Sequence, residues 1–110
     1  MTVLQTQQQL LALQGDLDQR SAPALKRAVQ DVPPGSRLVI DLAAVPFVDS
    51  LGIGALIGAI RRVHERGGSV AISSPTASVA HVLRLTGVSD LVPVVRAATA
   101  TATATTAVGE

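Results

Sequence analysis

Apolar and polar residues follow a pattern that predicts strands and helices in turn along the chain. Short runs rich in β-branched residues are typical of buried strands, and they occupy residues 37–42, 69–73 and 91–95. Apolar residues at helical spacing predict helices at about 21–31, at 50–66 and from 74 to Gly87. Residues 1–14 are expected to form two short strands or a hairpin. Strands that alternate with helices predict an α/β domain with at least one right-handed parallel crossover.

The last part of the chain has a composition of its own. Residues 97–107 contain only Ala and Thr. They offer no large apolar side chain that could anchor them on a core, so we expect residues 97–110 to form a disordered tail, with a frayed helix or an extended edge segment as alternatives. The folded domain is therefore predicted to span residues 1–96.

The overall composition excludes several classes of protein. Of the 110 residues, 47% are hydrophobic and 15% are charged, the net charge is +1, and Phe47 is the single aromatic residue. A disordered chain is less apolar, and a nucleic-acid-binding domain is more basic and carries aromatic residues for base stacking. The chain has no Cys, which excludes a disulfide scaffold, a thiolate zinc site and cysteine catalysis.

No segment predicts a membrane span or a signal peptide. The apolar stretch Leu38–Ile60 is interrupted by Asp41 and Asp49 and falls short of the roughly 18 uncharged apolar residues that a span needs. The N-terminus has no basic region ahead of an apolar one. We therefore expect a cytoplasmic protein that binds neither membranes nor nucleic acid.

The helix predicted at 50–66 has one ordinary face and one unusual face. Its apolar stripe, which we expect to face the sheet, consists of Ile53, Leu56, Ile57, Ile60 and Val63. The opposite face carries Leu51, Gly54, Gly58, Arg61, Arg62 and Glu65. A glycine in a helix costs about 1 kcal/mol, so two of them one turn apart require a reason. Either another element of the same domain packs against them, or the face is kept clear for a partner protein.

Ser50 is expected at the N-cap of this helix, where two interpretations are open. Its hydroxyl could accept a hydrogen bond from a backbone N–H of the first turn, and capping alone would then explain the residue. A phosphate at the same place would meet the unpaired N–H groups and would add about −1.5 to −2 charges beside Asp49. The position is therefore either a simple cap or a switch.

The segment from Leu38 to Gly54 resembles the signature of the STAS domain, in particular that of the small bacterial anti-sigma factor antagonists. It reads LVIDL and, after a short gap, FVDSLGIG. The likeness extends to LQGDLD at 13–18, to Gly67-Gly68 before a strand and to LRLTGV at 83–88. It covers residues 3–95 in order and implies a STAS-type single domain, in which helices pack on a mixed β-sheet of four to five strands.

The resemblance also implies a function. In that family the serine directly after the aspartate is the phosphoacceptor, which places this role on Ser50. An anti-sigma factor with serine kinase activity phosphorylates that serine, and a metal-dependent serine phosphatase reverses the step. The unphosphorylated protein binds the anti-sigma factor and thereby releases a sigma factor. The residues expected to contact the partner are Asp18, Asp49, Leu51, Gly52, Gly54, Gly58 and Arg61.

By the same resemblance, the chain is a non-enzymatic regulator of transcription in a stress response. It needs no cofactor and no metal, and it is a monomer or a weak dimer when free. Two positions depart from the family pattern. Leu51 stands where the family commonly has Ser or Thr, and the Ala/Thr-rich tail follows the last strand where the family usually has a helix.

Nucleotide binding and hydrolysis fit the sequence less well. Gly52, Gly54 and Gly58 come near the dinucleotide-binding fingerprint, but Asp49 would crowd a phosphate and the next strand lacks the acid that binds a ribose. A nucleophile elbow would need a glycine in place of Val48.

The remaining titratable residues suggest no catalytic or metal site. His64 and His81 are interpreted as core or boundary residues. Asp16 and Asp18 lie in one turn, but further metal ligands at a recognisable spacing are missing. Within the resemblance, the alternative function is that of a STAS domain that is never phosphorylated and acts as a scaffold or ligand sensor.

Overall fold

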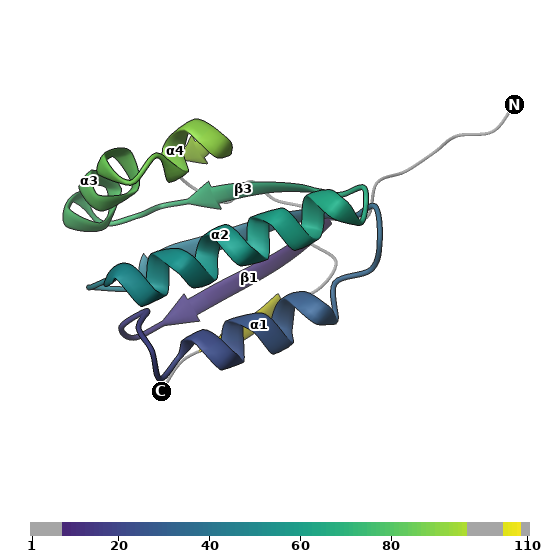
Figure 1. The fold of residues 1–110 in the computed structure, drawn as a ribbon, viewed down its shortest axis with the longest axis horizontal. Coiled ribbons are helices and arrows are strands. Elements are labelled where there is room, and N and C mark those ends of the chain that lie inside the picture. Colours follow the sequence, from purple (N-terminus) through teal and green to yellow (C-terminus); the bar gives the residue numbers. More distant parts are fainter. Residues whose placement is uncertain (1–7, 97–104, 109–110) are drawn as a thin grey trace, which may run out of the picture.

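The computed structural model (Figure 1) describes residues 8–96 and, as backbone, residues 105–108. They form a sheet of five strands in the order β4-β3-β2-β1-β5, in which all neighbouring strands are parallel. The strands are β1 (Gln8–Gln14), β2 (Arg37–Ala44), β3 (Ser69–Ser73), β4 (Val94–Val95) and β5 (Thr105–Val108). The helices are α1 (Ala22–Gln30), α2 (Ser50–Glu65), α3 (Ala77–Leu85) and α4 (Val88–Leu91). The α/β class predicted from the alternation of elements is confirmed.

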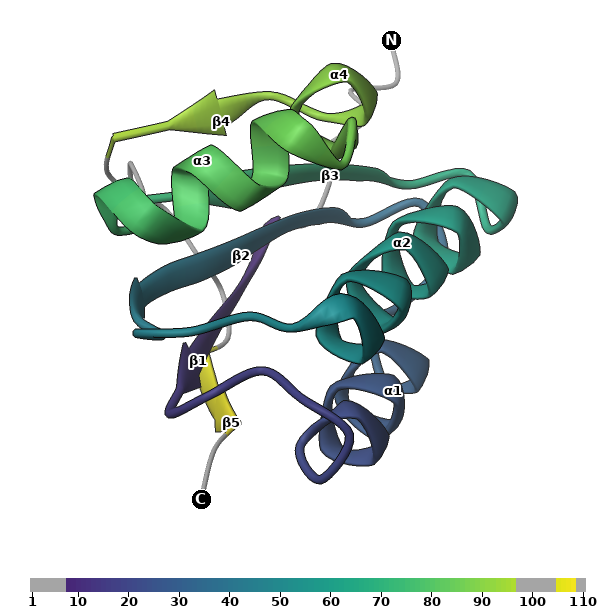
Figure 2. The ribbon, with the colours of Figure 1, turned by 60° about the vertical axis from the view of Figure 1, so that its left-hand side comes forward.

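The helices pack on one face of the sheet (Figure 2). Alternate strand residues point to that face, and the buried ones are Leu11, Leu13, Leu38, Ile40, Leu42, Val70 and Ile72. They form one hydrophobic cluster with buried side chains of all four helices, among them Leu25, Leu56, Val79 and Val88. Because α2 turns one side toward the sheet, its opposite side faces outward, with α1 lying next to it (Figure 1).

Helix α2 follows the predicted pattern closely. It spans Ser50–Glu65 and buries Ile53, Leu56, Ile60 and Val63, while Ile57 is half-buried. Gly67, with φ of +81°, adopts the left-handed conformation that ends a helix, as expected for a glycine at this point.

The region after α3 differs from the prediction of a strand at 91–95. Gly87 adopts φ of +82°, as a left-handed helix end requires, but a further helical turn, α4, follows it directly. Val88 and Val92 are both buried, and a spacing of four residues places two side chains on one side of a helix as well as on one face of a strand. The strand β4 is limited to two residues, Val94–Val95.

The structure describes only part of the two chain ends, for which strands at 1–14 and a disordered tail at 97–110 were expected. Two short strands or a hairpin were expected in residues 1–14; the structure describes one strand there, β1, and residues 1–7 lie outside the described residues. A mixed sheet was expected, and among the described strands every neighbouring pair is parallel. Residues 105–108 of the predicted tail form β5, which pairs in parallel with Leu10–Leu13 of β1. These four residues therefore form the extended edge segment that was given as an alternative to disorder. A strand of Thr and Ala residues is possible because β-branched Thr favours extended backbone.

Candidate docking site beside the start of helix α2

The turn after β1 and the segment leading into α2 are held together by their backbones. The Leu17 N–H donates to the Phe47 carbonyl at 2.9 Å, and the Asp49 N–H donates to the Leu17 carbonyl at 3.2 Å. Leu17 and Val48 form a parallel bridge there, and both are buried. These contacts fix the backbone on which Asp18 and Ser50 are carried, so the acidic turn and the start of α2 form one local unit.

Asp18 organises the beginning of α1. Its Oδ1 accepts hydrogen bonds from the backbone N–H of Arg20 at 2.9 Å and of Ser21 at 3.2 Å. The Ser21 Oγ in turn accepts from the Asp18 N–H at 3.0 Å. The residue is half-buried, and its hydrogen bonds give it a structural role in the turn.

The N-cap of α2 is Asp49, and not Ser50 as the sequence suggested. Asp49 has extended backbone, and its Oδ1 accepts a hydrogen bond from the Gly52 N–H at 2.7 Å. Aspartate and serine are both good N-caps, and here the longer acidic side chain takes the position. Ser50 is therefore the first residue inside the helix.

Ser50 is exposed, and its hydroxyl has no hydrogen-bond partner among the residues that the structure describes. Two large apolar side chains close to it in sequence, Phe47 and Leu51, are each 54% exposed. Exposed apolar side chains around an accessible polar group are typical of an interaction site. Since Asp49 provides the cap, capping no longer explains why a serine stands at position 50.

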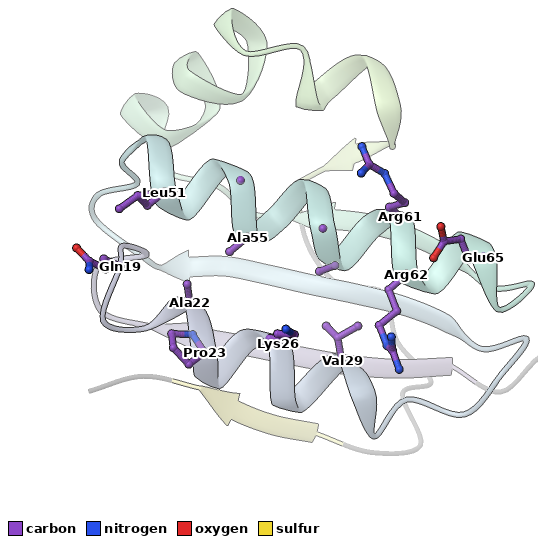
Figure 3. Close-up of a pocket in the computed structure, with 13 residues that line it drawn as sticks. Gln19, Ala22, Pro23, Lys26, Val29, Leu51, Ala55, Arg61, Arg62 and Glu65 are labelled. Atoms are coloured by element: carbon purple, nitrogen blue, oxygen red, sulfur yellow. The ribbon is translucent and has the colours of Figure 1, made fainter.

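A groove of about 740 Å³ runs between α1 and α2 (Figure 3). We call it the α1–α2 groove. Helix α1 and the turn before it contribute Gln19, Ala22, Pro23, Lys26 and Val29, and α2 contributes Leu51, Gly54, Ala55, Gly58, Ala59, Arg61, Arg62 and Glu65. The groove begins next to Ser50 at Leu51 and ends at the charged residues three turns later. Its floor consists of small side chains, so it is smooth along its length.

The glycines of α2 differ in what surrounds them. A Cβ atom on Gly54 or Gly58 would have no described atom within 4 Å, leaving aside the helix's own backbone. A Cβ atom on Gly52 would lie 2.1 Å from the carbonyl oxygen of Leu17. Gly52 is therefore required by the close approach of α2 to the turn, and it is buried and outside the groove. No described element packs on Gly54 and Gly58, so of the two explanations for these glycines, packing within the domain finds no support.

Replacing Gly58 by Ala is expected to stabilise the protein by about 1 kcal/mol, because alanine is the better helix former and the added methyl group meets open space. Gly58→Glu is expected to fold as well. Urea unfolding followed by circular dichroism measures both changes. A loss of stability in Gly58→Ala would show that this face is packed against another part of the chain.

Charged residues line the middle of the groove, at Lys26, and its far end, on α2. Lys26, Arg61, Arg62 and Glu65 are all exposed, and Arg62 extends toward α1 whereas Arg61 leaves α2 on the opposite side (Figure 3). Within the described part of the chain, none of the four forms an ion pair of 4.0 Å or less. The cationic end thus lies about 16 Å along the helix from Ser50, at 1.5 Å per residue.

The histidines are on the surface, contrary to the sequence-based interpretation. His64 and His81 are both exposed. Among the described residues there is no group of three or more His, Cys, Asp or Glu side chains that could hold a metal ion.

The structure brings together only some of the residues that the sequence singled out. Leu51, Gly54, Gly58 and Arg61 all line the groove, and Asp49 stands at its beginning. The contribution of α1 was missed, since periodicity assigns faces to one helix at a time and does not show which helix lies beside which. In the sequence of α1, the one residue that stood out was Lys26, because it is the single lysine of the chain.

The chain thus combines a parallel sheet that carries helices on one face with an exposed serine at the start of the helix that follows the second strand. The chain belongs to the STAS family: the family model described as "Mlab, STAS domain" matches residues 1–93. The resemblance noted in the sequence is thereby confirmed.

Several relatives have known roles. The anti-sigma-B factor antagonist of Bacillus subtilis is 30% identical over 81 residues, which are 73% of this chain and 74% of the relative. That of Listeria monocytogenes is 29% identical over 82 residues, 73% of this chain and 72% of the relative. The structure of the STAS domain of a SulP transporter from Vibrio cholerae matches with a TM-score of 0.72 at 28% identity, over 86% of this chain and 77% of that one. In the described residues, none of the helices has the length and apolarity needed to cross a bilayer.

Proposed function

We propose that this chain is an anti-sigma factor antagonist whose binding is switched by phosphorylation of Ser50. In the unphosphorylated form it binds an anti-sigma factor with serine kinase activity, so that the sigma factor is released. The kinase transfers the γ-phosphoryl group of ATP to the Ser50 Oγ, which loses its proton, and ADP leaves. A serine phosphatase hydrolyses the phosphate ester and restores the binding form.

The observation that carries this proposal is the position of Ser50. Ser50 is exposed, the role of N-cap is taken by Asp49, and the nearby residues Phe47 and Leu51 have exposed apolar side chains. Curated relatives that share about three tenths of the aligned residues are named anti-sigma-B factor antagonists, which supports the choice of partner.

The charge change at Ser50 provides the physical basis of the switch. A phosphate adds about −1.5 to −2 charges beside the carboxylate of Asp49 and changes the net charge of the chain from +1 to about −1. A partner that covers Phe47 and Leu51 would either have to bury this dianion or lose its apolar contacts with these two side chains. Burial of an unpaired charge is costly, so the phosphorylated form is released.

We propose the exposed residues around Ser50 and along the α1–α2 groove as the docking surface. Leu51, Gly54, Gly58 and Arg61 would contact the partner directly. Asp18 and Gly52 would act mainly by holding the backbone of the acidic turn and of the first helical turn in place, as their hydrogen bonds and close contacts suggest.

Phosphorylation by the anti-sigma kinases encoded in the same genome tests the proposal. The purified protein is incubated with each kinase and ATP, and the phosphate is located by mass spectrometry. We expect one phosphate per chain on Ser50, none on Ser50→Ala, and unchanged phosphorylation of Ser78→Ala, which removes another exposed serine, on α3. If Ser50 stays unmodified with every such kinase, the switch is wrong.

A second function is favoured by one observation. The likeness to the STAS domain of a SulP transporter supports a domain that is never phosphorylated and acts as a scaffold or ligand sensor. In that case the α1–α2 groove would bind its partner constitutively, and charge at position 50 would have little effect on binding.

A further inference from the structure

The α1–α2 groove has the size and the lining of a site for a small molecule. Its volume of about 740 Å³ lies within the range of about 300–1,000 Å³ that is usual for ligand sites. Most of the residues that line it are apolar residues or glycines, and the polar ones are Gln19, Lys26, Arg61, Arg62 and Glu65. A ligand in this groove would therefore meet hydrocarbon along most of its length and charge at a few points.

The apolar and the charged residues occupy different parts of the groove. The apolar part begins at Leu51 and follows α2 to Gly58, a length of about 10 Å along the helix. In the cationic part, Lys26 lies on the side of α1 that borders the groove, and Arg62 extends from α2 toward α1 (Figure 3). Two cations from opposite walls thus lie at the end of an apolar channel.

The glycines of α2 keep the apolar part open. A Cβ atom on Gly54 or Gly58 would have no described atom within 4 Å, leaving aside the helix's own backbone, so any larger side chain would extend into the groove. Neither glycine has a positive φ, and glycine is a poor helix former. The helix backbone therefore does not require them, and the space that they leave is their evident effect.

The two cations have no partner among the described residues. Neither Lys26 nor Arg62 forms an ion pair or a side-chain hydrogen bond there. Glu65 is the one acid that lines the groove, whereas Lys26, Arg61 and Arg62 are positive. An apolar channel with an excess of positive charge favours an anion that carries an apolar tail.

We propose that the α1–α2 groove binds the anion of a free fatty acid of medium chain length. The carboxylate lies between Lys26 and Arg62, and arginine binds carboxylates through two parallel hydrogen bonds. The acyl chain lies along Gly58 and Gly54 and ends near Leu51. A sugar or a nucleotide would need hydrogen-bonding side chains along its length, whereas the part from Leu51 to Gly58 offers them only at Gln19, at its beginning.

A bound acid would also affect the switch. Leu51 directly follows Ser50, so the end of the acyl chain would cover apolar surface that we assign to the anti-sigma factor. The acid and the anti-sigma factor would then compete, and a metabolite as well as a kinase would control the interaction. This consequence rests on the proposed function, whereas the binding of the acid does not.

Isothermal titration calorimetry of the full chain with hexanoate, octanoate and decanoate tests the proposal. Complete burial of one methylene group tightens binding about fourfold, and a groove that is open on one side should give about twofold. We therefore expect one decanoate per chain, with a Kd below about 1 mM and at least about tenfold tighter than that of hexanoate. A weaker Kd for decanoate, or equal affinities for the three acids, would overturn the proposal.

Filling the apolar part tests where the acyl chain lies. Gly58→Leu is expected to weaken decanoate binding at least about tenfold, because the leucine side chain occupies the space of the acyl chain. Ala77→Leu adds the same side chain at an exposed position of α3, outside the groove, and should bind decanoate normally. Equal binding by the two variants would show that the acid does not lie in the groove.

Removing one positive charge tests where the carboxylate lies. Lys26→Gln and Arg62→Gln are each expected to bind decanoate at least about fivefold more weakly. Arg84→Gln, which removes an exposed arginine of α3, should have no effect. Decanol has no charge, so its weaker binding should be the same in all three variants. Equal binding of decanoate by Arg62→Gln and Arg84→Gln would contradict the position of the head group.

Vesicles of phosphatidylglycerol distinguish a free acid from a lipid surface, and we expect the protein not to sediment with them. Sedimentation with the vesicles without binding of decanoate would overturn the proposal. Circular dichroism and the urea midpoint confirm that each variant is folded. Because no kinase and no anti-sigma factor are used, a failure to bind decanoate would leave the proposed function untouched, and an unmodified Ser50 would leave the binding of the acid untouched.

Discussion

Ser50→Asp is expected to bind the anti-sigma kinase at least about 100-fold more weakly than the unmodified protein, whereas Ser50→Ala is expected to bind it normally and to resist release by ATP. The aspartate places a second carboxylate beside Asp49, at the edge of an apolar docking surface. A charge in such a place costs several kcal/mol on binding, and about 2.7 kcal/mol corresponds to 100-fold. Isothermal titration calorimetry with and without ATP measures both variants.

Ser50→Asn is the matched control for this prediction, since it has the size of aspartate without its charge. It should bind much more tightly than Ser50→Asp, because charge and not bulk is the cause. Gly58→Glu, which adds charge further along the groove, should also weaken binding while the circular dichroism spectrum stays that of the folded domain. Similar affinities of Ser50→Asp and Ser50→Ala would contradict the switch and would favour the constitutive scaffold.

Gly52→Ala is expected to destabilise the domain by about 3 kcal/mol or more. The new Cβ atom would lie 2.1 Å from the carbonyl oxygen and 2.7 Å from the carbonyl carbon of Leu17. These are backbone atoms of a buried residue, held by hydrogen bonds to Phe47 and Asp49, so they cannot move aside cheaply. Overpacking usually costs about 1–3 kcal/mol, and this site belongs at or above the upper end. Urea unfolding followed by circular dichroism measures the loss.

Gly54→Ala, two residues further along the helix, is the matched control. It adds the same methyl group where nothing lies within 4 Å, and it should stabilise the domain by up to about 1 kcal/mol. Opposite changes in the free energy of unfolding would show that packing requires a glycine at position 52 and does not require one at position 54. Equal effects of the two substitutions would mean that the turn at Leu17 does not contact α2 as described.

The main features of the fold could be predicted because α2 and the strands around it have strong periodicity. The predicted helix at 50–66 and strand at 69–73 agree with the structure to within a residue. The short helix α4 was missed because it buries only Val88, and the buried Val92 that follows it fits an apolar strand. An apolar pattern that is only one turn long does not distinguish a helix from a strand.

The site was harder to predict than the fold, for reasons that depend on geometry. Asp49 and Ser50 are both good N-caps and stand next to each other, so the choice between them is made by the turn that holds the backbone of Asp49. The sequence grouped Gly52 with Gly54, although they lie on opposite sides of α2. The wall of the groove formed by α1 depends on which helices are neighbours, and local patterns contain no information on that.

The N-cap at Asp49 has a consequence for the lifetime of the protein. The residue that stabilises the first turn of α2 is not the residue that we expect to be modified, so phosphorylation would leave the cap hydrogen bond to Gly52 in place. A phosphate at a helix start changes stability by about 1 kcal/mol at most in exposed positions. Proteases that degrade unfolded chains would then remove the two forms at rates that differ by about fivefold at most. The signal would be stored in the ratio of two folded populations, and it could be reset without new synthesis of the protein.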